Sequence, residues 1–375
     1  MKYCTKCVLP ETHETIEFDS KGVCNICRQA EKKHGEIDWN ARGEMLQKIV
    51  AQYKEFNQYD CILPYSGGKD SVYQLWYVVT QLKMKPLVVR FDHWGFRPLV
   101  AKNNHKIFKK LGVDVLQFTP NWHVVKKLML TSMRETGDFC WHCHTGVFGY
   151  VMQISVKFNI PLVIFGESPA EYRAYTSFEQ MQELEQDAFD QFVNLGLDSR
   201  QILKLLGKEF SYRDLMPFEF PPKTELTKMK SKAIWLGNYI KWDTKNNVEI
   251  IKKDLGWEGQ KVEGIPPEYD YEKIECMWQG VRDYCKFIKR GHGRTNHLMC
   301  IDIRAGRMNR DKALELCDKY DGKRPQSLDV FLNALGISEE EFVNEISKNS
   351  HPNYKFEGKN IKKGERLPDA DEWII

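Results

Sequence analysis

The sequence has no apolar run near the roughly 18 residues that a membrane-spanning helix needs, and its first residues lack the apolar core of a signal peptide. Low-complexity tracts and evident internal repeats are also absent. The formal net charge is only +3 over 375 residues, whereas dedicated nucleic-acid-binding proteins more often carry a larger, clustered basic excess. We therefore expect a globular, cytoplasmic protein that binds neither membranes nor nucleic acid.

What the sequence does contain is eleven cysteines, which cytoplasmic proteins keep as reduced thiols or use as metal ligands. Cys4 and Cys7 form one C-x2-C pair, and sixteen residues separate it from a second pair, Cys24 and Cys27. This spacing is typical of a four-thiolate zinc ribbon, in which two tight turns point four sulfur atoms at one ion. We predict that residues 1–35 form such a ribbon around a structural Zn²⁺.

A third C-x2-C pair, Cys140 and Cys143, lies in the run DFCWHCHTGVFGY beside two histidines. Three interpretations remain open at the level of sequence. The two residues could be buried thiols at the start of a helix, or they could form a redox pair. They could also belong to a second metal or iron-sulfur site, completed by a distant cysteine such as Cys276, Cys285 or Cys300.

Between the ribbon and residue 256, short apolar runs alternate with amphipathic helical patterns. This alternation predicts an α/β fold with a mainly parallel, doubly wound sheet, whose ligands bind at the carboxyl ends of the strands. The predicted strands lie at 59–66, 86–92, 114–120, 161–168 and 232–243.

We therefore assign residues 36–256 to one α/β domain, interrupted by a helical insertion near 178–216. From 257 to 375 the pattern is mostly helical and predicts a small C-terminal domain. With 42% hydrophobic and 29% charged residues, the composition suits a chain with a few globular domains.

The run SGGKDS, residues 66–71, follows the first predicted strand directly and opens a helix. Adjacent glycines at this point expose backbone N–H groups at the positive end of the helix dipole, where an anion binds. Lys69 adds a positive charge. Asp70 would repel phosphates unless a cation lies between them, so its presence points to Mg²⁺ and a nucleotide. The Walker pattern is absent, and GHGRTN at 291–296 lacks the third glycine of a dinucleotide fingerprint.

SGGKDS in this strand-to-helix context resembles the signature of the PP-loop ATP pyrophosphatases, which cleave ATP between its α- and β-phosphates. The resemblance implies that Lys69 and Asp70 are catalytic and that the whole loop holds the pyrophosphate end of ATP. By position in the fold, Phe91-Asp92 and Gly166-Glu167 would border the nucleotide. The loop residues implied are Ser66, Gly67, Gly68, Lys69, Asp70 and Ser71.

The rest of the chain resembles the N-acetyl sugar amidotransferases of bacterial surface-glycan pathways, through the ribbon, GES-PA-EY at 166–172, WLGNYIKWD and the run from YCKFIKRGHGR to YDGKRP. The resemblance implies that the chain adenylates the acetamido oxygen of an acidic N-acetyl amino sugar, which is nucleotide-linked or free. Ammonia then replaces AMP and gives an acetamidino group. Because no glutaminase nucleophile pattern is present, we expect a separate glutaminase partner that supplies the ammonia.

Guanidinium groups bind carboxylates and diphosphates through two hydrogen bonds, so arginines of the C-terminal third are candidate substrate ligands. Solvated arginines on a helix face are an equally good interpretation for each one alone. The candidates are Arg290, Arg294, Arg304, Arg307 and Arg310. Other histidines show no metal-type spacing, and we expect most of them on the surface or hydrogen-bonded in the core: His93, His105, His123, His292 and His297.

Two other functions would also use parts of this sequence. A tRNA 2-thiolation enzyme would also combine a ribbon, a PP-loop and a C-x2-C pair that carries a cluster. The small net charge and the lack of a recognisable RNA-binding module argue against it. A zinc-ribbon scaffold that binds ATP as an assembly signal would not need so complete a phosphate-binding turn.

Overall fold

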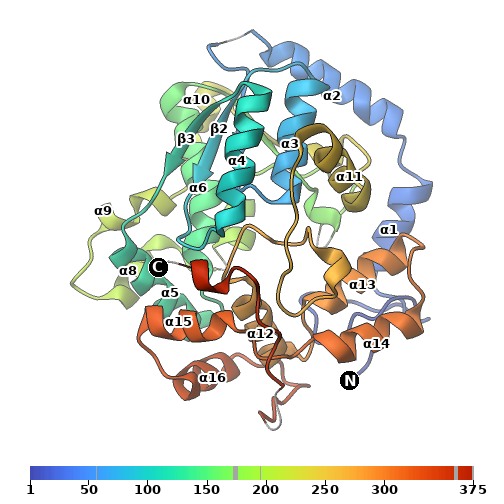
Figure 1. The fold of residues 1–375 in the computed structure, drawn as a ribbon. Coiled ribbons are helices and arrows are strands. Elements are labelled where there is room, and N and C mark those ends of the chain that lie inside the picture. Colours follow the sequence, from blue (N-terminus) through green and yellow to red (C-terminus); the bar gives the residue numbers. More distant parts are fainter. Residues whose placement is uncertain (56, 172–175, 195, 359–361, 374–375) are drawn as a thin grey trace.

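The computed structural model describes residues 1–55, 57–171, 176–194, 196–358 and 362–373, and its centre is a five-stranded parallel sheet (Figure 1). The strand order is β3-β2-β1-β4-β5. The chain therefore leaves β1 in one direction and returns beside it as β4, which places the switch point of the topology between these two strands. The strands are β1 Cys61–Pro64, β2 Pro86–Phe91, β3 Asp114–Phe118, β4 Leu162–Phe165 and β5 Lys232–Trp235.

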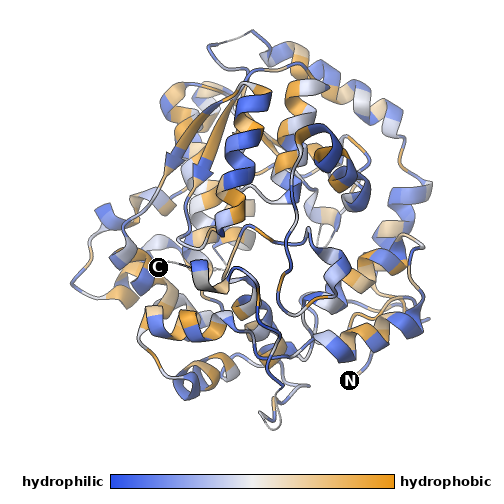
Figure 2. Ribbon diagram, in the orientation of Figure 1, coloured by the Kyte–Doolittle hydropathy of each residue, from blue (hydrophilic) through white to orange (hydrophobic). Residues whose placement is uncertain are grey.

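Helices cover both faces of the sheet. Alternate strand residues point to opposite faces, so Leu63 packs with α3 and α11, whereas Ile62 packs with α6. The strands are largely hydrophobic in Figure 2, and β1, β2, β4 and β5 are almost entirely buried, as expected for a sheet covered on both sides, whereas the edge strand β3 is mostly exposed. The helices of this region are α2 Trp39–Tyr53, α3 Lys69–Thr80, α4 Pro98–Leu111, α5 Trp122–Thr136, α6 Trp141–Phe158, α10 Lys223–Met229 and α11 Thr244–Leu255. The predicted parallel, doubly wound α/β fold is confirmed.

The last predicted strand, 232–243, is shorter than expected. β5 ends at Trp235, and residues Leu236–Asn238 form a 3-10 turn. The cause is a close approach: a Cβ on Gly237 would lie 2.6 Å from the backbone nitrogen of Ser168, and the Gly237 N–H donates to the Gly166 carbonyl at 2.9 Å. The turn after β5 therefore packs onto the segment that follows β4, at the carboxyl edge of the sheet.

The segment predicted as a helical insertion, near 178–216, contains only short helices where it is described. They are α7 Gln186–Ala188, the π-helix Phe189–Val193, α8 Ser199–Leu206 and α9 Tyr212–Leu215, followed by a 3-10 turn at Met216–Phe218. They pack against α5 and α6, and the Trp141 indole N–H donates to the Leu197 carbonyl at 2.9 Å. The boundaries of this insertion stay a prediction.

After α11 the chain crosses the carboxyl edge of the sheet in a segment whose described regular element is a 3-10 turn at Pro267–Tyr269. From α12 onward the chain is helical, as predicted. The C-terminal helices are α12 Gln279–Arg290, α13 Arg294–Arg304, α14 Arg310–Tyr320, α15 Ser327–Leu335 and α16 Glu339–Ser347. The N-terminal segment, with α1 Asn25–Gly35, lies beside α13 and α14 in Figure 1. Within the described residues no helix is both long and apolar enough to cross a membrane.

Candidate functional site

The SGGKDS turn lies at the carboxyl end of β1, the central strand, and leads into α3. Gly67 has φ +91°, and a Cβ there would lie 2.6 Å from side-chain atoms of Val100 and Asn104. This left-handed backbone and the tight contact both require glycine. Gly68 is the N-cap residue of α3, so the backbone donors of the turn lie at the positive end of the helix.

Two serine hydroxyls organise the donors of this turn. Ser71 Oγ accepts the N–H groups of Ser66 at 3.3 Å and Gly67 at 3.1 Å, and it donates to the Gly68 carbonyl at 3.0 Å. The Gly68 N–H donates to Ser66 Oγ at 3.2 Å. The two hydroxyls therefore engage the N–H groups of Ser66, Gly67 and Gly68 and fix this turn at a helix N-terminus, where the helix dipole favours an anion.

Lys69 is buried, and its ammonium group lies 2.8 Å from a carboxylate oxygen of Asp70 and 2.8 Å from one of Glu272. Burial by itself lowers the pKa of Lys69, but Asp70, Glu272 and Glu167 together raise it well above its ordinary value. In Glu272, burial is outweighed by Lys69 and Arg294, which hold its pKa at about 2. Lys69 is therefore a permanent cation in the turn, positioned by a residue from the C-terminal part of the chain.

Carboxylates crowd around this lysine. A Cβ on Gly68 would lie 2.4 Å from a carboxylate oxygen of Glu275, so that side chain sits directly against the turn. The pKa of Glu167 is raised to about 8, first by burial and then by the charge of Asp70. Asp70 and Glu167 both offer carboxylate oxygens, which are the ligands that Mg²⁺ prefers. Asp70 and Glu167 thus fit the predicted Mg²⁺.

The other residues predicted to border the nucleotide follow β4 and β2. Gly166 lies close to the turn, because a Cβ there would be 3.7 Å from the Asp70 carbonyl oxygen. Asp92 instead accepts the Trp94 N–H at 2.9 Å and the Thr119 hydroxyl at 3.1 Å. Its carboxylate fixes the loop after β2, and its role toward a nucleotide stays a prediction.

The four ribbon cysteines meet as predicted. Their sulfur atoms lie within 4.8 Å of one another, and all four side chains are buried. Two of the sulfur atoms, those of Cys7 and Cys24, are 3.8 Å apart, which is about the separation that four Zn–S bonds of roughly 2.3 Å impose in a tetrahedron. Backbone N–H groups of Cys7 and Cys24 point at the Cys4 sulfur, at 3.4 Å and 3.2 Å. These residues fit a structural Zn²⁺.

The second pair, Cys140 and Cys143, lies at the start of α6 near the same edge of the sheet. Both thiols interact electrostatically with Cys276 and with the guanidinium of Arg282. Among the distant cysteines, Cys276 is thus near enough to act electrostatically on the pair, whereas Cys300 lies against the ribbon next to Cys7. Among the described residues only the ribbon cysteines group within 4.8 Å, so the three thiols are not set for one small ion.

The five candidate arginines lie in different surroundings. Arg294 faces the SGGKDS turn, since its guanidinium lies 3.6 Å from the carboxylate of Glu272, which pairs with Lys69 of that turn. Arg290 lies near the ribbon loop, where it pairs with Glu14 at 2.9 Å. The remaining three contact the ribbon or the scaffold; Arg304 also acts on Glu171 and has a buried Nη1 without a hydrogen-bond partner among the described residues, so its role toward a substrate stays a prediction. Arg304 interacts with Cys300 and Cys7, Arg307 pairs with Asp243 and Asp302, and Arg310 donates to the carbonyls of Cys7 and Cys4.

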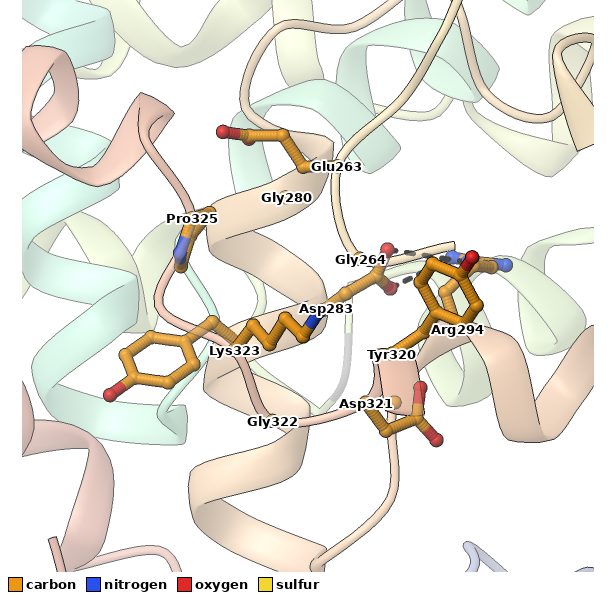
Figure 3. Close-up of a pocket in the computed structure, with 12 residues that line it drawn as sticks. Glu263, Gly264, Gly280, Asp283, Arg294, Tyr320, Asp321, Gly322, Lys323 and Pro325 are labelled. Carbon is orange, nitrogen blue, oxygen red and sulfur yellow. Dashed lines mark hydrogen bonds and ion pairs between the residues drawn. The ribbon is translucent and has the colours of Figure 1, made fainter. Parts of the chain in front are cut away.

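A hollow beside Arg294 is shown in Figure 3, where the side chains of Asp283 and Arg294 meet. Asp283 holds the guanidinium at 3.2 Å. The other two acids of this hollow are engaged as helix caps. Asp321 accepts the Thr295 N–H at 2.9 Å at the start of α13, and Glu263 accepts the Ser327 N–H at 3.0 Å at the start of α15. The Asp283 carboxylate therefore fixes Arg294 in position beside this hollow.

Sequence reasoning missed the acidic residues that the C-terminal part adds to the turn. Glu272 and Glu275 occur in the run YDYEKIEC, which carries no recognisable motif. It also missed His13, and His292 is an exception to the expectation for most of the histidines. His292 is 2% exposed, and neither ring nitrogen has a hydrogen-bond partner in the part of the chain that the structure describes. Only the folded chain brings Glu272 to Arg294 and His13 to His292.

Three comparisons with known proteins bear on this arrangement. A protein of Methanocaldococcus jannaschii, named as uncharacterized, is 24% identical over 164 residues, which are 44% of this chain. The match covers 58% of that relative's length. Two solved structures overlap loosely at 12% identity. NMN synthetase from Francisella tularensis has a TM-score of 0.35, with 76% of this chain and 93% of that chain covered. The tRNA thiolase NcsA from Methanococcus maripaludis, with its 4Fe-4S cluster, has a TM-score of 0.28, and the overlap covers 68% of this chain and 83% of that chain.

Overlaps of this quality support no argument about chemistry. The family comparison is more informative, because it falls on the part of the chain that supplies Glu272, Glu275, Arg290 and Arg294. Residues 263–368 match the family described as LPS biosynthesis protein WbpG-like, C-terminal domain.

Proposed function

We propose that this protein is an ATP-dependent amidotransferase of bacterial surface-glycan synthesis. The observation that carries the proposal is the Lys69–Glu272 pair, because it joins the phosphate-binding turn to the segment that matches the WbpG-like domain. A nucleotide bound at residues 66–71 and a sugar bound by the C-terminal part would then share one site. The substrate is an acidic N-acetyl amino sugar, and the product carries an acetamidino group.

The reaction has two steps. The acetamido oxygen attacks the α-phosphorus of ATP, and pyrophosphate leaves. Ammonia then adds to the activated carbon, AMP departs with the former amide oxygen, and an amidine remains. An amide oxygen is a very poor leaving group, so adenylation removes most of the barrier to the second step.

This chain's residues act mainly by position and charge. Bound Mg²⁺ would neutralise the polyphosphate and balance Asp70 and Glu167. Lys69 is held as a cation by Asp70 and Glu272, so it stabilises the negative charge that grows on the departing pyrophosphate without having to reorganise. The serine hydroxyls and backbone donors of the turn fix the phosphates for in-line attack. The ammonia comes from a separate glutaminase.

The proposal is tested by turnover. Anaerobically purified protein is incubated with ATP, Mg²⁺, ammonium and a panel of nucleotide-linked and free acidic acetamido sugars, and AMP, pyrophosphate and sugar mass are followed. We expect AMP, pyrophosphate and amidino sugar in equal amounts. AMP formation without a change in sugar mass, for every sugar tried, would contradict the proposal.

The gathering of Cys140, Cys143 and Cys276 favours a second candidate, tRNA 2-thiolation with a cysteine-bound cluster. The same incubation separates the two functions when tRNA and a sulfur source are supplied in place of the sugar and ammonium. AMP that forms only with tRNA and sulfur would move the assignment to thiolation. Iron and sulfide analysis of the anaerobic protein would show whether the three thiols carry a cluster.

A further inference from the structure

Six basic side chains gather where the end of α12 and the start of α13 meet the ribbon. We call them the basic cluster: His13, Lys286, Arg290, His292, Arg294 and His297. The imidazole rings of His13 and His292 stack, with centroids 5.6 Å apart and planes inclined by 25°. The cluster therefore joins a residue from the first part of the chain to residues from the region that matches the WbpG-like domain.

Two hydrogen bonds fix the ribbon side of the basic cluster. The Thr12 hydroxyl donates to the Arg290 carbonyl at 2.6 Å, and the Arg290 guanidinium donates to the Thr12 carbonyl at 2.8 Å. Gly291, with φ +74°, makes the sharp turn between α12 and α13. These hydrogen bonds hold the segment with His13 against the turn with His292, so their positive groups lie close to one another.

The carboxylates around the basic cluster leave several of its nitrogen atoms without a hydrogen-bond partner among the described residues. Glu14 pairs with Arg290 at 2.9 Å, Asp283 with Arg294 at 3.2 Å, and Glu272 with Arg294 at 3.6 Å, although Glu272 is shared with Lys69. Both ring nitrogens of His292 and the Arg290 Nε atom are buried without a hydrogen-bond partner among the described residues. Buried polar groups are normally paired, so an acceptor belongs here.

The charges of the basic cluster disfavour one another. Burial, followed by the charges of Arg294 and Arg290, lowers the pKa of Lys286 to about 8. Burial and Lys286 hold the pKa of His292 well below its ordinary value, and burial and Arg294 do the same for His297. An anion would reverse the electrostatic part of these effects, so its binding should be accompanied by proton uptake.

The basic cluster also has a direct connection to the nucleotide turn. Arg294 contacts Glu272, and Glu272 contacts Lys69, so one carboxylate separates the two sets of cations. An anion in the basic cluster would therefore be linked to Lys69 through Arg294 and Glu272.

We propose that the basic cluster binds the anionic group of the sugar substrate, a carboxylate or a phosphate, and thereby orients the acetamido group toward the nucleotide at residues 66–71. The inference rests on the proposed function for the identity of the sugar. The ribbon then takes part in substrate binding, since it contributes His13.

The test is calorimetric binding with the full-length, zinc-loaded protein. The nucleotide turn is first saturated with Mg²⁺ and an ATP analogue that cannot be cleaved between the α- and β-phosphates. UDP and a free hexuronic acid are then titrated separately, in two buffers of different ionisation enthalpy. Binding of UDP alone identifies a diphosphate site, and binding of the hexuronic acid alone identifies a carboxylate site. We expect at least one to bind with proton uptake.

Two variants assign the binding to the basic cluster. Arg290→Gln and His292→Gln should each weaken anion binding roughly tenfold, as loss of a charge-assisted or buried hydrogen bond does. Zinc content and melting temperature check that both variants fold. Arg134→Gln, an exposed pair partner of Glu341 on α5, is the matched control and should bind normally. If neither anion binds, or if both cluster variants bind them normally, the inference is overturned.

The outcome is separable from that of the proposed function, because binding is measured without turnover. Anion binding that depends on the basic cluster, together with no amidine product from any sugar, would keep the site and remove the reaction. Amidine formation together with unaltered anion binding in both variants would support the proposed reaction and contradict the anion site.

Discussion

The ammonium group of Lys69 lies 2.8 Å from the carboxylate of Glu272, and both side chains are almost completely buried, at 7% and 5% exposed. The contact joins the phosphate-binding turn to a segment that comes after the whole sheet has been completed. The surroundings of Lys69 are therefore complete only when the C-terminal part has docked across the carboxyl edge of the strands. Glu275, which lies against Gly68, adds a second contact of the same kind.

Lys69→Met should reduce ATP-dependent AMP formation by roughly 100-fold or more, the loss seen when one preorganised charge donor is removed from a transition state. It should also lower the free energy of unfolding by about 3–5 kcal/mol, because Glu272 loses its main buried partner. Zinc content should not change. AMP release and denaturant unfolding measure the two effects.

The double variant Lys69→Met with Glu272→Gln separates these effects. Removal of the second charge should restore most of the stability while activity stays low. Lys106→Met, which breaks the exposed pair with Glu258, is the control and should cost no more than about 1 kcal/mol. Unchanged turnover in the Lys69 variants would refute the assignment of the turn.

Glu167 should make the metal-free protein less stable as pH rises. Its pKa is raised from an ordinary 4.5 to about 8 in the folded chain, so the folded state keeps a proton that the unfolded chain has released. This contribution to stability is complete below the lower value and is lost as pH rises through the upper one. If Mg²⁺ binds at Glu167 as proposed, it would replace that proton, so Mg²⁺ with ATP should stabilise the protein more strongly at the alkaline end.

The check is the melting temperature of the wild type and of Glu167→Gln across this pH window, with and without Mg²⁺ and ATP. The glutamine variant should lose the part of the pH slope that belongs to Glu167. Identical slopes in the two proteins would show that Glu167 does not titrate there.

Cys24→Ser should remove the zinc ion and destabilise the ribbon, because the ion is the main constraint on a segment with few regular hydrogen bonds. The bound zinc per chain and the melting temperature should fall together. Cys317→Ser, which changes a half-buried thiol outside the ribbon group, should leave the zinc content normal. Full zinc occupancy in the Cys24 variant would contradict the four-cysteine assignment.

The C-terminal tail is fastened by a buried ion pair whose loss should be costly. Arg97 donates to Asp369 through two bonds, of 2.7 Å and 2.6 Å, and the two side chains are 1% and 7% exposed. Asp369→Ala leaves the guanidinium buried without its carboxylate, so we expect a loss of about 3–5 kcal/mol in denaturant unfolding.

A second acidic residue of the tail provides the control. Glu365 forms an exposed pair with Lys261, and Glu365→Ala should cost about 1 kcal/mol at most. Equal losses for the two variants would mean that burial does not distinguish these ion pairs.

The local elements of this protein were readable from its sequence. The strand-turn-helix at residues 61–80 carries its own information, since the left-handed backbone at Gly67 strongly favours glycine and Gly68 begins the helix directly after it. The four-cysteine spacing likewise determines the ribbon, because two short turns suffice to bring the sulfur atoms together. Both signals are local, and local backbone geometry depends mainly on neighbouring residues.

The contents of the site were decided by the tertiary structure. Glu272 and Glu275 reach the turn, and His13 meets His292, through packing between segments that the sequence keeps far apart. Cys276, among the distant cysteines, lies beside Cys140 and Cys143 for the same reason. Charge and burial at these positions arise from the whole fold, so no pattern along the chain could separate them from ordinary surface residues.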